Sequence, residues 1–366
     1  MPKLKQILLN DTVLCLAILL ACISSIFYTP RLSYIDFDVL CVLLSLMLVV
    51  AGLKSINFLD WLAIELLNKC TTNRQMSFVL IGITYFSSMF VTNDVALLTF
   101  VPLSLVIGQT LKMDMDRIII IQTLAANLGS MLTPMGNPQN LFLYTHYNYT
   151  PEHFFGVIAV PCVLSLLYIA FLLMRKPVVT LELQLSKLSC PQHIKLIVLL
   201  VLLFINLVAV LHWLDKTLAL AITAVVIFCL DRKLFKLVDY SLLITFAGFF
   251  IFIGNLTASS LTVYLQQSLL GTATGTYFVG LIASQFISNV PAAMLLAGLS
   301  QEADALLLGV NVGGLGTMIA SMASVISYKL FAAQHPAEAG KYVRTFLYYN
   351  ISGLLLLGGV VYFLLL

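Results

Sequence analysis

The chain has 366 residues, of which 61% are hydrophobic and only 10% are charged. This composition excludes an ordinary soluble domain and a disordered chain, and it is typical of an all-α polytopic membrane protein. The formal net charge is only +3 at pH 7. This balance says little about partners, and it is the apolar composition that predicts the lipid bilayer, and not nucleic acid, as the partner surface.

Apolar runs long enough to cross a bilayer follow one another along the chain. The first follows MPKLK and is too long for a signal peptide, so it predicts a transmembrane helix. Segments 55–69 and 257–270 favour amphipathic helices that lie along the membrane interface. The predicted spans are 7–28, 37–53, 76–109, 118–147, 154–174, 194–211, 217–231, 239–254, 275–298, 305–330 and 345–366.

Two neighbouring runs are broken in their middle by polar residues and proline. The first reads FSSMFVTNDVALLTFVPL, and the second reads TLAANLGSMLTPMGNPQNLFLY. A single kink in a transmembrane helix is usually structural. Hydrocarbon offers no water to satisfy freed backbone groups, however, so paired breaks predict a cavity enclosed by protein. Such a cavity is the expected binding site of a transporter.

The same pair of broken runs occurs again later in the chain. FVTNDVALL (Phe90–Leu98) matches FISNVPAAM (Phe286–Met294), and NLGSMLTPMGNPQN (Asn127–Asn140) matches NVGGLGTMIASMAS (Asn311–Ser324). A third pair, 37–53 and 239–255, precedes them in the same order. The sequence therefore predicts an internal duplication. We expect a first repeat at 1–176, a loop and a connecting helix at 177–216, and a second repeat at 217–366.

The basic residues predict the topology. If runs 76–109 and 275–298 are re-entrant helical hairpins, every Lys and Arg except Arg31 and Lys216 falls on the side of the N-terminus. Basic residues mark the cytoplasmic side, so the N-terminus is expected to be cytoplasmic. In this arrangement the two halves cross in opposite directions. They form inverted structural repeats, each with a re-entrant hairpin and a broken transmembrane helix.

Polar side chains at the breaks are the candidate ligands for substrate or ion. Half-helix N-termini can hold an anion, and freed carbonyls with Thr, Ser and Asn oxygens can coordinate Na⁺. Some of the hydroxyl groups are expected to bond to their own helix instead. The candidates are Thr92, Asn93, Asn127, Thr133, Asn137, Asn140, Ser288, Asn289, Asn311, Thr317, Ser321 and Ser324.

Asp94 is a separate case, because this topology places it deep in the membrane without a Lys or Arg at the same depth. A carboxylate there is costly, and it is a candidate coupling group that carries a proton or binds a cation. The alternative is a structural role, in which Asp94 caps the second helix of its hairpin.

Other classes of function find less support in the sequence. No phosphate-binding G-x-x-x-x-G-K-[ST] motif occurs, so nothing in the sequence indicates that ATP hydrolysis drives transport. No paired Asp, Ser/Lys or His/Glu constellation lies at depth, so we expect no enzyme and no cofactor beyond a coupling Na⁺ or H⁺. A passive channel is the main alternative, since Asn137-Pro138-Gln139 is similar to the Asn-Pro motif of water channels.

At TNDVALLTFVPL, SMLTPMGNPQN, SQFISNVP and NVGGLGTM the chain resembles the ion transporter superfamily. That superfamily includes arsenite permeases, NhaD-type Na⁺/H⁺ antiporters and dicarboxylate symporters, and the resemblance is greatest to YbiR-like anion permeases of the bacterial inner membrane. It implies a secondary transporter of a small ion or oxyacid. It also implies a homodimer whose transport domain moves like an elevator against a scaffold.

The dicarboxylate branch carries Ser-Asn-Thr at each hairpin tip, which binds carboxylate and Na⁺. Here the matching triplets are Thr92-Asn93-Asp94 and Ser288-Asn289-Val290. The resemblance thus implies Na⁺ ligands at Thr92, Asn93, Ser288 and Asn289. The third residue of the triplet is not Thr in either repeat, which argues against dicarboxylate:Na⁺ symport. The Asn-Asp tip is more similar to the arsenite-permease and antiporter branches, so the resemblance favours proton coupling and leaves Na⁺/H⁺ antiport as an alternative.

Overall fold

The computed structural model describes residues 12–174, 178–181, 185–186, 188–189, 192–257, 266 and 269–366. Within these ranges the regular structure is helical, apart from one isolated antiparallel bridge between Thr72 and Thr180. In the same ranges six helices are long and apolar enough to cross a membrane. The predicted all-helical polytopic fold is confirmed.

The two repeats contain matching series of helices. The first consists of α3 (Phe37–Ser55), α4 (Phe58–Leu67), α5 (Asn73–Val91), α6 (Asn93–Leu111), α7 (Asp116–Ser130), α8 (Pro138–His146) and α9 (Pro151–Met174). The second consists of α12 (Tyr240–Thr257), α14 (Ala273–Ile287), α15 (Asn289–Ala297), α16 (Ala303–Gly313), α17 (Met322–Gln334) and α18 (Ala339–Leu365). Three helices lie outside this correspondence: α2 (Thr12–Phe27), α10 (His193–Val210) and α11 (Lys216–Leu230).

These helices agree with the predicted spans to within a few residues at most ends, because long apolar runs bounded by polar caps determine where transmembrane helices begin. Asp36 caps α3, and Thr72 and Thr272 cap the first helix of each hairpin through backbone N–H groups three residues on. The amphipathic helix predicted at 55–69 corresponds to α4. The one predicted at 257–270 lies largely outside the described residues.

Each hairpin reverses direction at a single residue. Thr92 joins α5 to α6 with φ 73° and ψ 154°, and Ser288 joins α14 to α15 with φ 74° and ψ 153°. Residues other than glycine rarely adopt this conformation, which costs on the order of 1–3 kcal/mol and persists only where the surroundings impose it. The same strained backbone at two matched positions is direct structural evidence of the duplication.

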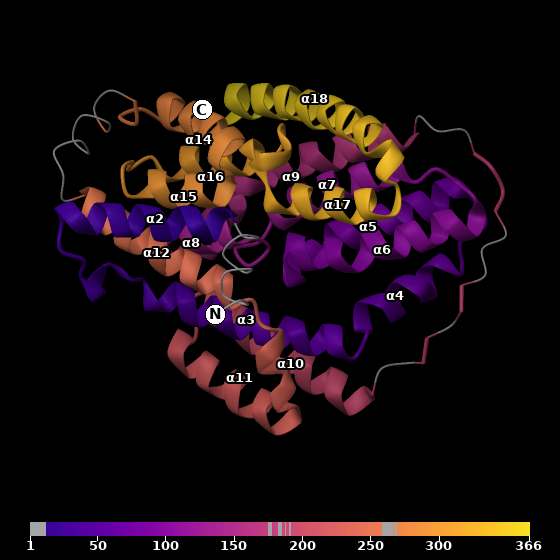
Figure 1. The fold of residues 1–366 in the computed structure, drawn as a ribbon, viewed down its shortest axis with the longest axis horizontal. Helices are drawn as coiled ribbons and strands as arrows, with labels where there is room; N and C mark the ends of the chain where they lie inside the picture. The colour runs from indigo at the N-terminus through magenta and orange to yellow at the C-terminus, as the bar shows by residue number, and fades with distance from the viewer. Residues whose placement is uncertain are drawn as a thin grey trace.

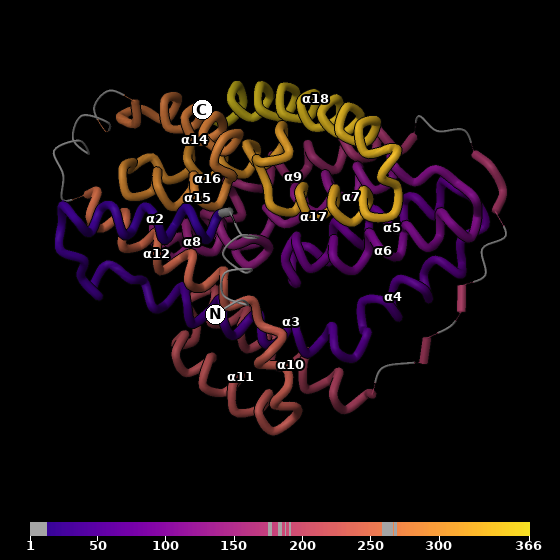
Figure 2. Tube along the Cα trace, in the orientation of Figure 1, coloured from indigo at the N-terminus to yellow at the C-terminus, as the bar shows by residue number. Residues whose placement is uncertain are grey.

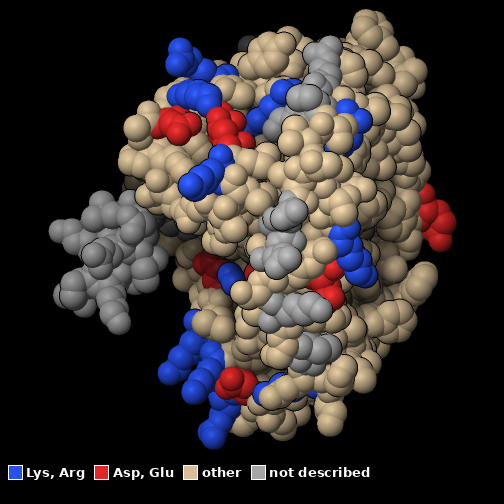
Figure 3. Space-filling view, turned by 90° about the vertical axis from the view of Figure 1, so that its right-hand side faces the viewer, with Lys and Arg blue, Asp and Glu red and all other residues tan. Residues whose placement is uncertain are grey.

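Contacts near the helix ends show which ends lie together on each of two opposite faces of the protein. On one face, which we call the hairpin-1 face, Arg74 at the start of α5 bonds to Met174 at the end of α9. On the same face Lys341 at the start of α18 forms ion pairs with Asp114 and Asp116, at 2.7 and 3.0 Å. Both ends of the first hairpin therefore lie on the hairpin-1 face, which Figure 3 shows with its scattered Lys and Arg side chains.

The second hairpin opens on the opposite face, the hairpin-2 face. Thr276 near the start of α14 lies 2.9 Å from the Ser300 hydroxyl, just beyond the end of α15. His153 at the start of α9 pairs with Asp304 at the start of α16 on this same face. The hairpins thus enter from opposite sides, as expected for inverted repeats.

We distinguish two groups of helices, whose positions can be followed in Figure 1. The α3 group contains α2, α3, α10, α11 and α12. Asn206 of α10 bonds to Ser45 of α3 and, at 2.9 Å, to Thr223 of α11. Asn255 of α12 bonds to two serines of α2, which lies beside it in Figure 2. The second group, the hairpin group, contains both hairpins, both broken helices, α9 and α18.

Small residues allow the hairpins to approach the broken helices closely, as is common in membrane proteins. A Cβ added at Gly129 of α7 would lie 2.3 Å from the carbonyl oxygen of Tyr85 in α5. Substitution must therefore push these two helices apart.

We predict that Gly129→Ala destabilises the protein by about 1–3 kcal/mol through this overpacking. Gly82→Ala is the matched control in α5, because an added Cβ there meets nothing within 4 Å. Thermal unfolding of the two purified variants measures the difference. Equal midpoints for Gly129→Ala and wild type would show that the helices can separate without cost.

Candidate functional site

Four helices begin around one small cavity between the hairpin tips. Helices α6 and α15 begin at the two tips, and α8 and α17 begin where the two broken transmembrane helices resume. The cavity, which we call the tip cavity, has a volume of about 150 Å³. Its lining residues are Val13, Asn93, Asp94, Pro138, Gln139, Asp239, Ser241, Leu242, Thr245, Ser288, Asn289, Val290, Pro291, Ser321, Met322 and Ile326.

This convergence gives the cavity a positive electrostatic character at its helix ends. The N-terminus of a helix carries unsatisfied N–H groups and the positive end of the helix dipole, both of which favour an anion. Two of the four helix starts come from each repeat. Both halves of the chain thus contribute helix N-termini to the wall of this cavity, which Asp94 and Asp239 also line.

A hydrogen-bond network with twofold pseudosymmetry lies beneath the cavity. In one half, Asn127 accepts a bond from the Ser321 hydroxyl at 2.9 Å and donates to Ser324 at 3.4 Å. In the other half, Asn311 accepts from Asn137 at 3.4 Å and donates to Asn140 at 2.7 Å.

The correspondence is complete, because the sequence match pairs Asn127 with Asn311, Asn137 with Ser321 and Asn140 with Ser324. Each break is thus held by the repeat to which it does not belong. Buried polar groups of this kind are costly unless every partner is in place.

Thr133 and Thr317 fasten the loops of the breaks to the hairpins. The Thr133 hydroxyl donates to the carbonyl oxygen of Met89 at 2.5 Å, and the Thr317 hydroxyl donates to that of Gln285 at 2.9 Å. These two contacts are again symmetry mates. Both threonines hold the backbone next to a tip, and neither lines the tip cavity.

The candidate residues from the sequence therefore fall into three sets. Those that line the tip cavity are Asn93, Asp94, Ser288, Asn289 and Ser321. Thr92 and Asn137 line a second, adjoining cavity. The buried network and the loop fastenings use Asn127, Asn140, Asn311, Ser324, Thr133 and Thr317.

Asp94 does not act as the cap of its own helix through a hydrogen bond. Its backbone N–H is instead capped by the Asn93 side chain at 3.0 Å. The Oδ1 atom of Asp94 is buried and has no hydrogen-bond partner. The structural alternative considered for Asp94, a capping carboxylate, thus lacks the bond that would define it.

Three further residues of the tip cavity had no functional signal in the sequence. Asp239 directly precedes α12, and Ser241 and Thr245 lie in the first two turns of that helix. An Asp ahead of an apolar run is typical of a helix cap at the membrane surface, and Asp239 does accept bonds from the N–H and the hydroxyl of Ser241. Only the packing of α12 beside the tips brings Asp239 to the site.

A larger cavity connects the site to the hairpin-1 face. This access cavity measures about 410 Å³ and shares Asp94, Pro138 and Asp239 with the tip cavity. It extends between α3 and the first hairpin to Lys54 and Ser55 at the end of α3. The site is therefore reached from the hairpin-1 face.

The second hairpin is closed over the site on the opposite face. The Tyr147 hydroxyl donates to the carbonyl oxygen of Ser300 at 2.9 Å, which ties the end of α8 to the end of the second hairpin. A Cβ added at Gly298 would lie 2.4 Å from the Ile253 side chain, so the hairpin also packs tightly on α12. The asymmetry of access is thus a property of how the two hairpins pack.

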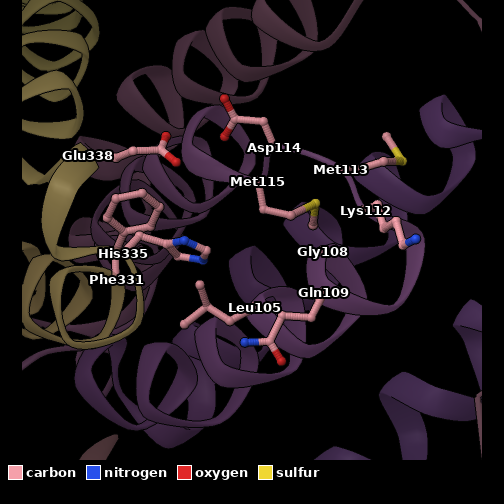
Figure 4. A pocket seen from close by; sticks show the side chains of 10 residues that line it. All are labelled: Leu105, Gly108, Gln109, Lys112, Met113, Asp114, Met115, Phe331, His335 and Glu338. Atoms are coloured by element: carbon pink, nitrogen blue, oxygen red, sulfur yellow. The ribbon is translucent and has the colours of Figure 1, made fainter.

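Another cavity, of about 310 Å³, lies at the hairpin-1 face between the ends of α6 and α17 (Figure 4). Its walls include Lys112, Asp114, His335 and Glu338. None of the residues that line it also lines the tip cavity. We place the candidate site at the tips, because the two hairpin tips and the two helix breaks meet only in the tip cavity among the cavities described.

Inverted repeats with two re-entrant hairpins and paired helix breaks define a multi-pass membrane transporter. The chain belongs to the citrate transporter family, whose model matches residues 5–327. It is 29% identical over 342 residues to an uncharacterized transporter of Methanocaldococcus jannaschii, covering 90% of this chain and 86% of that protein. It is 28% identical over 305 residues to the inner membrane protein YbiR of Escherichia coli, covering 81% and 80%.

The fold also has a solved counterpart. The YdaH transporter of Alcanivorax borkumensis, described as having an unusual topology, aligns with a TM-score of 0.51. The alignment covers 87% of this chain and 83% of that one, at 14% sequence identity. At this identity the similarity concerns the fold alone. The predicted membership of the ion transporter superfamily, with similarity to YbiR, is confirmed.

Proposed function

We propose that the protein is a secondary active transporter of a small anion or oxyacid, coupled to H⁺ or Na⁺. The observation that carries this proposal is the convergence of four helix N-termini, two from each repeat, on the tip cavity. Helix N-termini that line one cavity favour an anion there without a basic side chain. The name of the family makes citrate one candidate substrate. The small volume of the tip cavity makes smaller oxyacids equally good candidates.

In the part of the chain that the structure describes, the access cavity that opens to the hairpin-1 face supports a transporter over a passive channel. A channel needs a path that is continuous to both faces, whereas here the access cavity leads to the hairpin-1 face and the second hairpin packs against α8 and α12. Alternating access requires that the two hairpins exchange these roles. Because the two hairpins are related by pseudosymmetry, the packing after they exchange roles would resemble the packing before.

In this proposal Asn93, Ser288, Asn289 and Ser321 contact the substrate, and Thr92 and Asn137 line its path. The network of Asn127, Asn140, Asn311 and Ser324 holds the two helix breaks in position relative to each other. The hairpin group moves as an elevator against the α3 group, and the protein works as a homodimer in the inner membrane. Asp94 is the coupling group, with Na⁺/H⁺ antiport as the alternative within the class.

Single-cysteine labelling tests the orientation in which the hairpin-1 face is cytoplasmic. In a background without other cysteines, Asn148→Cys on the hairpin-2 face is expected to react with a membrane-impermeant maleimide in intact cells. Cys190, which lies outside the described residues, is expected to be protected until the membrane is permeabilised. The opposite pattern would reverse the orientation and place the access cavity on the outside.

A ligand screen tests the substrate class. Purified protein in detergent is heated with phosphate, sulfate, arsenite, acetate, succinate and citrate, each in the presence and in the absence of Na⁺. A ligand at 100 times its Kd raises the free energy of unfolding by about 2.7 kcal/mol, which a shift in thermal midpoint detects. Stabilisation by an anion that disappears in Asn289→Ala supports the site. Stabilisation that survives this substitution places binding elsewhere.

A further inference from the structure

The tip cavity brings together two acidic residues that are far apart in the sequence. Asp94 lies in the first turn of α6, in the hairpin group, and Asp239 lies just before α12, in the α3 group. Both line the tip cavity and both line the access cavity. Sequence matching gave no reason to bring them together, because Asp239 aligns with Phe37 in the other repeat.

The charges around this pair are unbalanced. Among the described residues that line the two cavities, the charged ones are Asp94, Asp239 and Lys54. Lys54 lies at the end of α3 and lines only the access cavity. Asp94 and Asp239 carry the same sign of charge, and both line the two cavities. Asp239 is exposed, whereas the Oδ1 atom of Asp94 is buried without a hydrogen-bond partner. A carboxylate placed in this way, next to a second negative charge, favours a proton or a bound cation that offsets its charge.

A third oxygen at the same place has no partner. Gln139, in the first turn of α8, is only 2% exposed, and its Oε1 atom is buried without a hydrogen-bond donor. A buried carbonyl oxygen left unpaired is costly, so such an atom points to a ligand. Gln139 lines the tip cavity together with both carboxylates.

We propose that Asp94, Asp239 and the Gln139 carbonyl oxygen hold one monovalent cation, Na⁺ or a proton, between the hairpin group and the α3 group. This inference rests on the proposed function and names the residues of its coupling step. Two carboxylates and an amide carbonyl oxygen suit a hard cation or a shared proton. Because the two carboxylates belong to different helix groups, any sliding of one group past the other changes the affinity for the cation. Cation binding and movement are thereby linked.

Cation-dependent stability of purified Asp239→Asn tests the proposal. Asn keeps the capping oxygen for Ser241, so folding should be preserved. Asp231→Asn is the matched control, because Asp231 caps the N–H of Lys233 in the same way but lines neither cavity. Two titrations identify the cation. The first varies Na⁺ at fixed pH, with choline keeping the ionic strength constant, and the second varies pH without Na⁺.

The wild type and Asp231→Asn are expected to show the same midpoint of stabilisation in one of the two titrations. Asp239→Asn should shift that midpoint by about tenfold or more, and Gln139→Leu should shift it in the same direction. An unchanged midpoint in Asp239→Asn would overturn the proposal, and so would a wild type that responds to neither titration. Exchange of labelled anion in proteoliposomes is measured in parallel. Exchange that persists in Asp239→Asn shows that the transport function stands even if the cation site fails.

Discussion

Asp94→Asn is expected to abolish the accumulation of substrate against its gradient while exchange of substrate across the membrane persists. The amide cannot release a proton, and it removes one negative charge from a cavity that Asp239 also lines. With 1:1 coupling, a tenfold cation gradient drives about tenfold accumulation in the wild type. The variant should equilibrate at a ratio of about one. The measurement is uptake into proteoliposomes under an imposed pH or Na⁺ gradient.

Asp114→Asn is the control for this experiment. Asp114 lies outside the tip cavity and pairs with Lys341 at the hairpin-1 face, so its loss should leave accumulation unchanged. If Asp94→Asn accumulates substrate as the wild type does, Asp94 has no role in coupling. Its carboxylate would then be structural, although no capping bond accounts for it.

Asn93→Ala and Asn289→Ala are each expected to abolish measurable transport. Both side chains are buried at a tip, with exposed fractions of 5% and 4%, and both line the tip cavity. A charge-assisted hydrogen bond to a bound anion contributes about 1.5–3 kcal/mol, which corresponds to about 10- to 150-fold in affinity. Such a loss leaves no measurable exchange at substrate concentrations that half-saturate the wild type, and exchange measured at higher concentrations gives the change in apparent affinity.

The two variants are expected to differ in stability. Asn93 also donates to Asn127 at 3.3 Å and caps Asp94, so Asn93→Ala should lower the thermal midpoint slightly. Among the described residues the Asn289 side chain makes no hydrogen bond of this kind, so Asn289→Ala should be as stable as the wild type. Normal expression with an unchanged apparent affinity in both variants would place the substrate away from the tips.

The sequence was sufficient to predict the helices, the hairpins and the duplication. Long apolar runs have few alternatives in a bilayer, and the polar interruptions at Thr92 and Ser288 coincide with the two tips. The charge asymmetry then predicted that the two hairpins open on opposite faces. These features could be predicted from local sequence patterns because hydrocarbon contains no water, which strongly limits where polar groups and helix ends can lie.

The partners of the candidate residues could not be predicted in the same way. Nothing local in the sequence shows that Asn127 bonds to Ser321, because this contact depends on how the repeats pack across their pseudo-twofold axis. Thr133 resembles a ligand in the sequence, yet its hydroxyl holds the backbone of Met89. Asp239 reaches the tip cavity only through the packing of α12.

Uptake by the wild-type protein in proteoliposomes tests the central claim most directly. The substrate is the anion that stabilises the protein in the ligand screen, and a tenfold gradient of H⁺ or Na⁺ is imposed across the membrane. We predict that uptake saturates with external concentration, that the internal concentration rises above the external one, and that an ionophore for the driving cation collapses this accumulation. Flux that increases linearly with concentration and never exceeds equilibrium would contradict the account and indicate a passive channel.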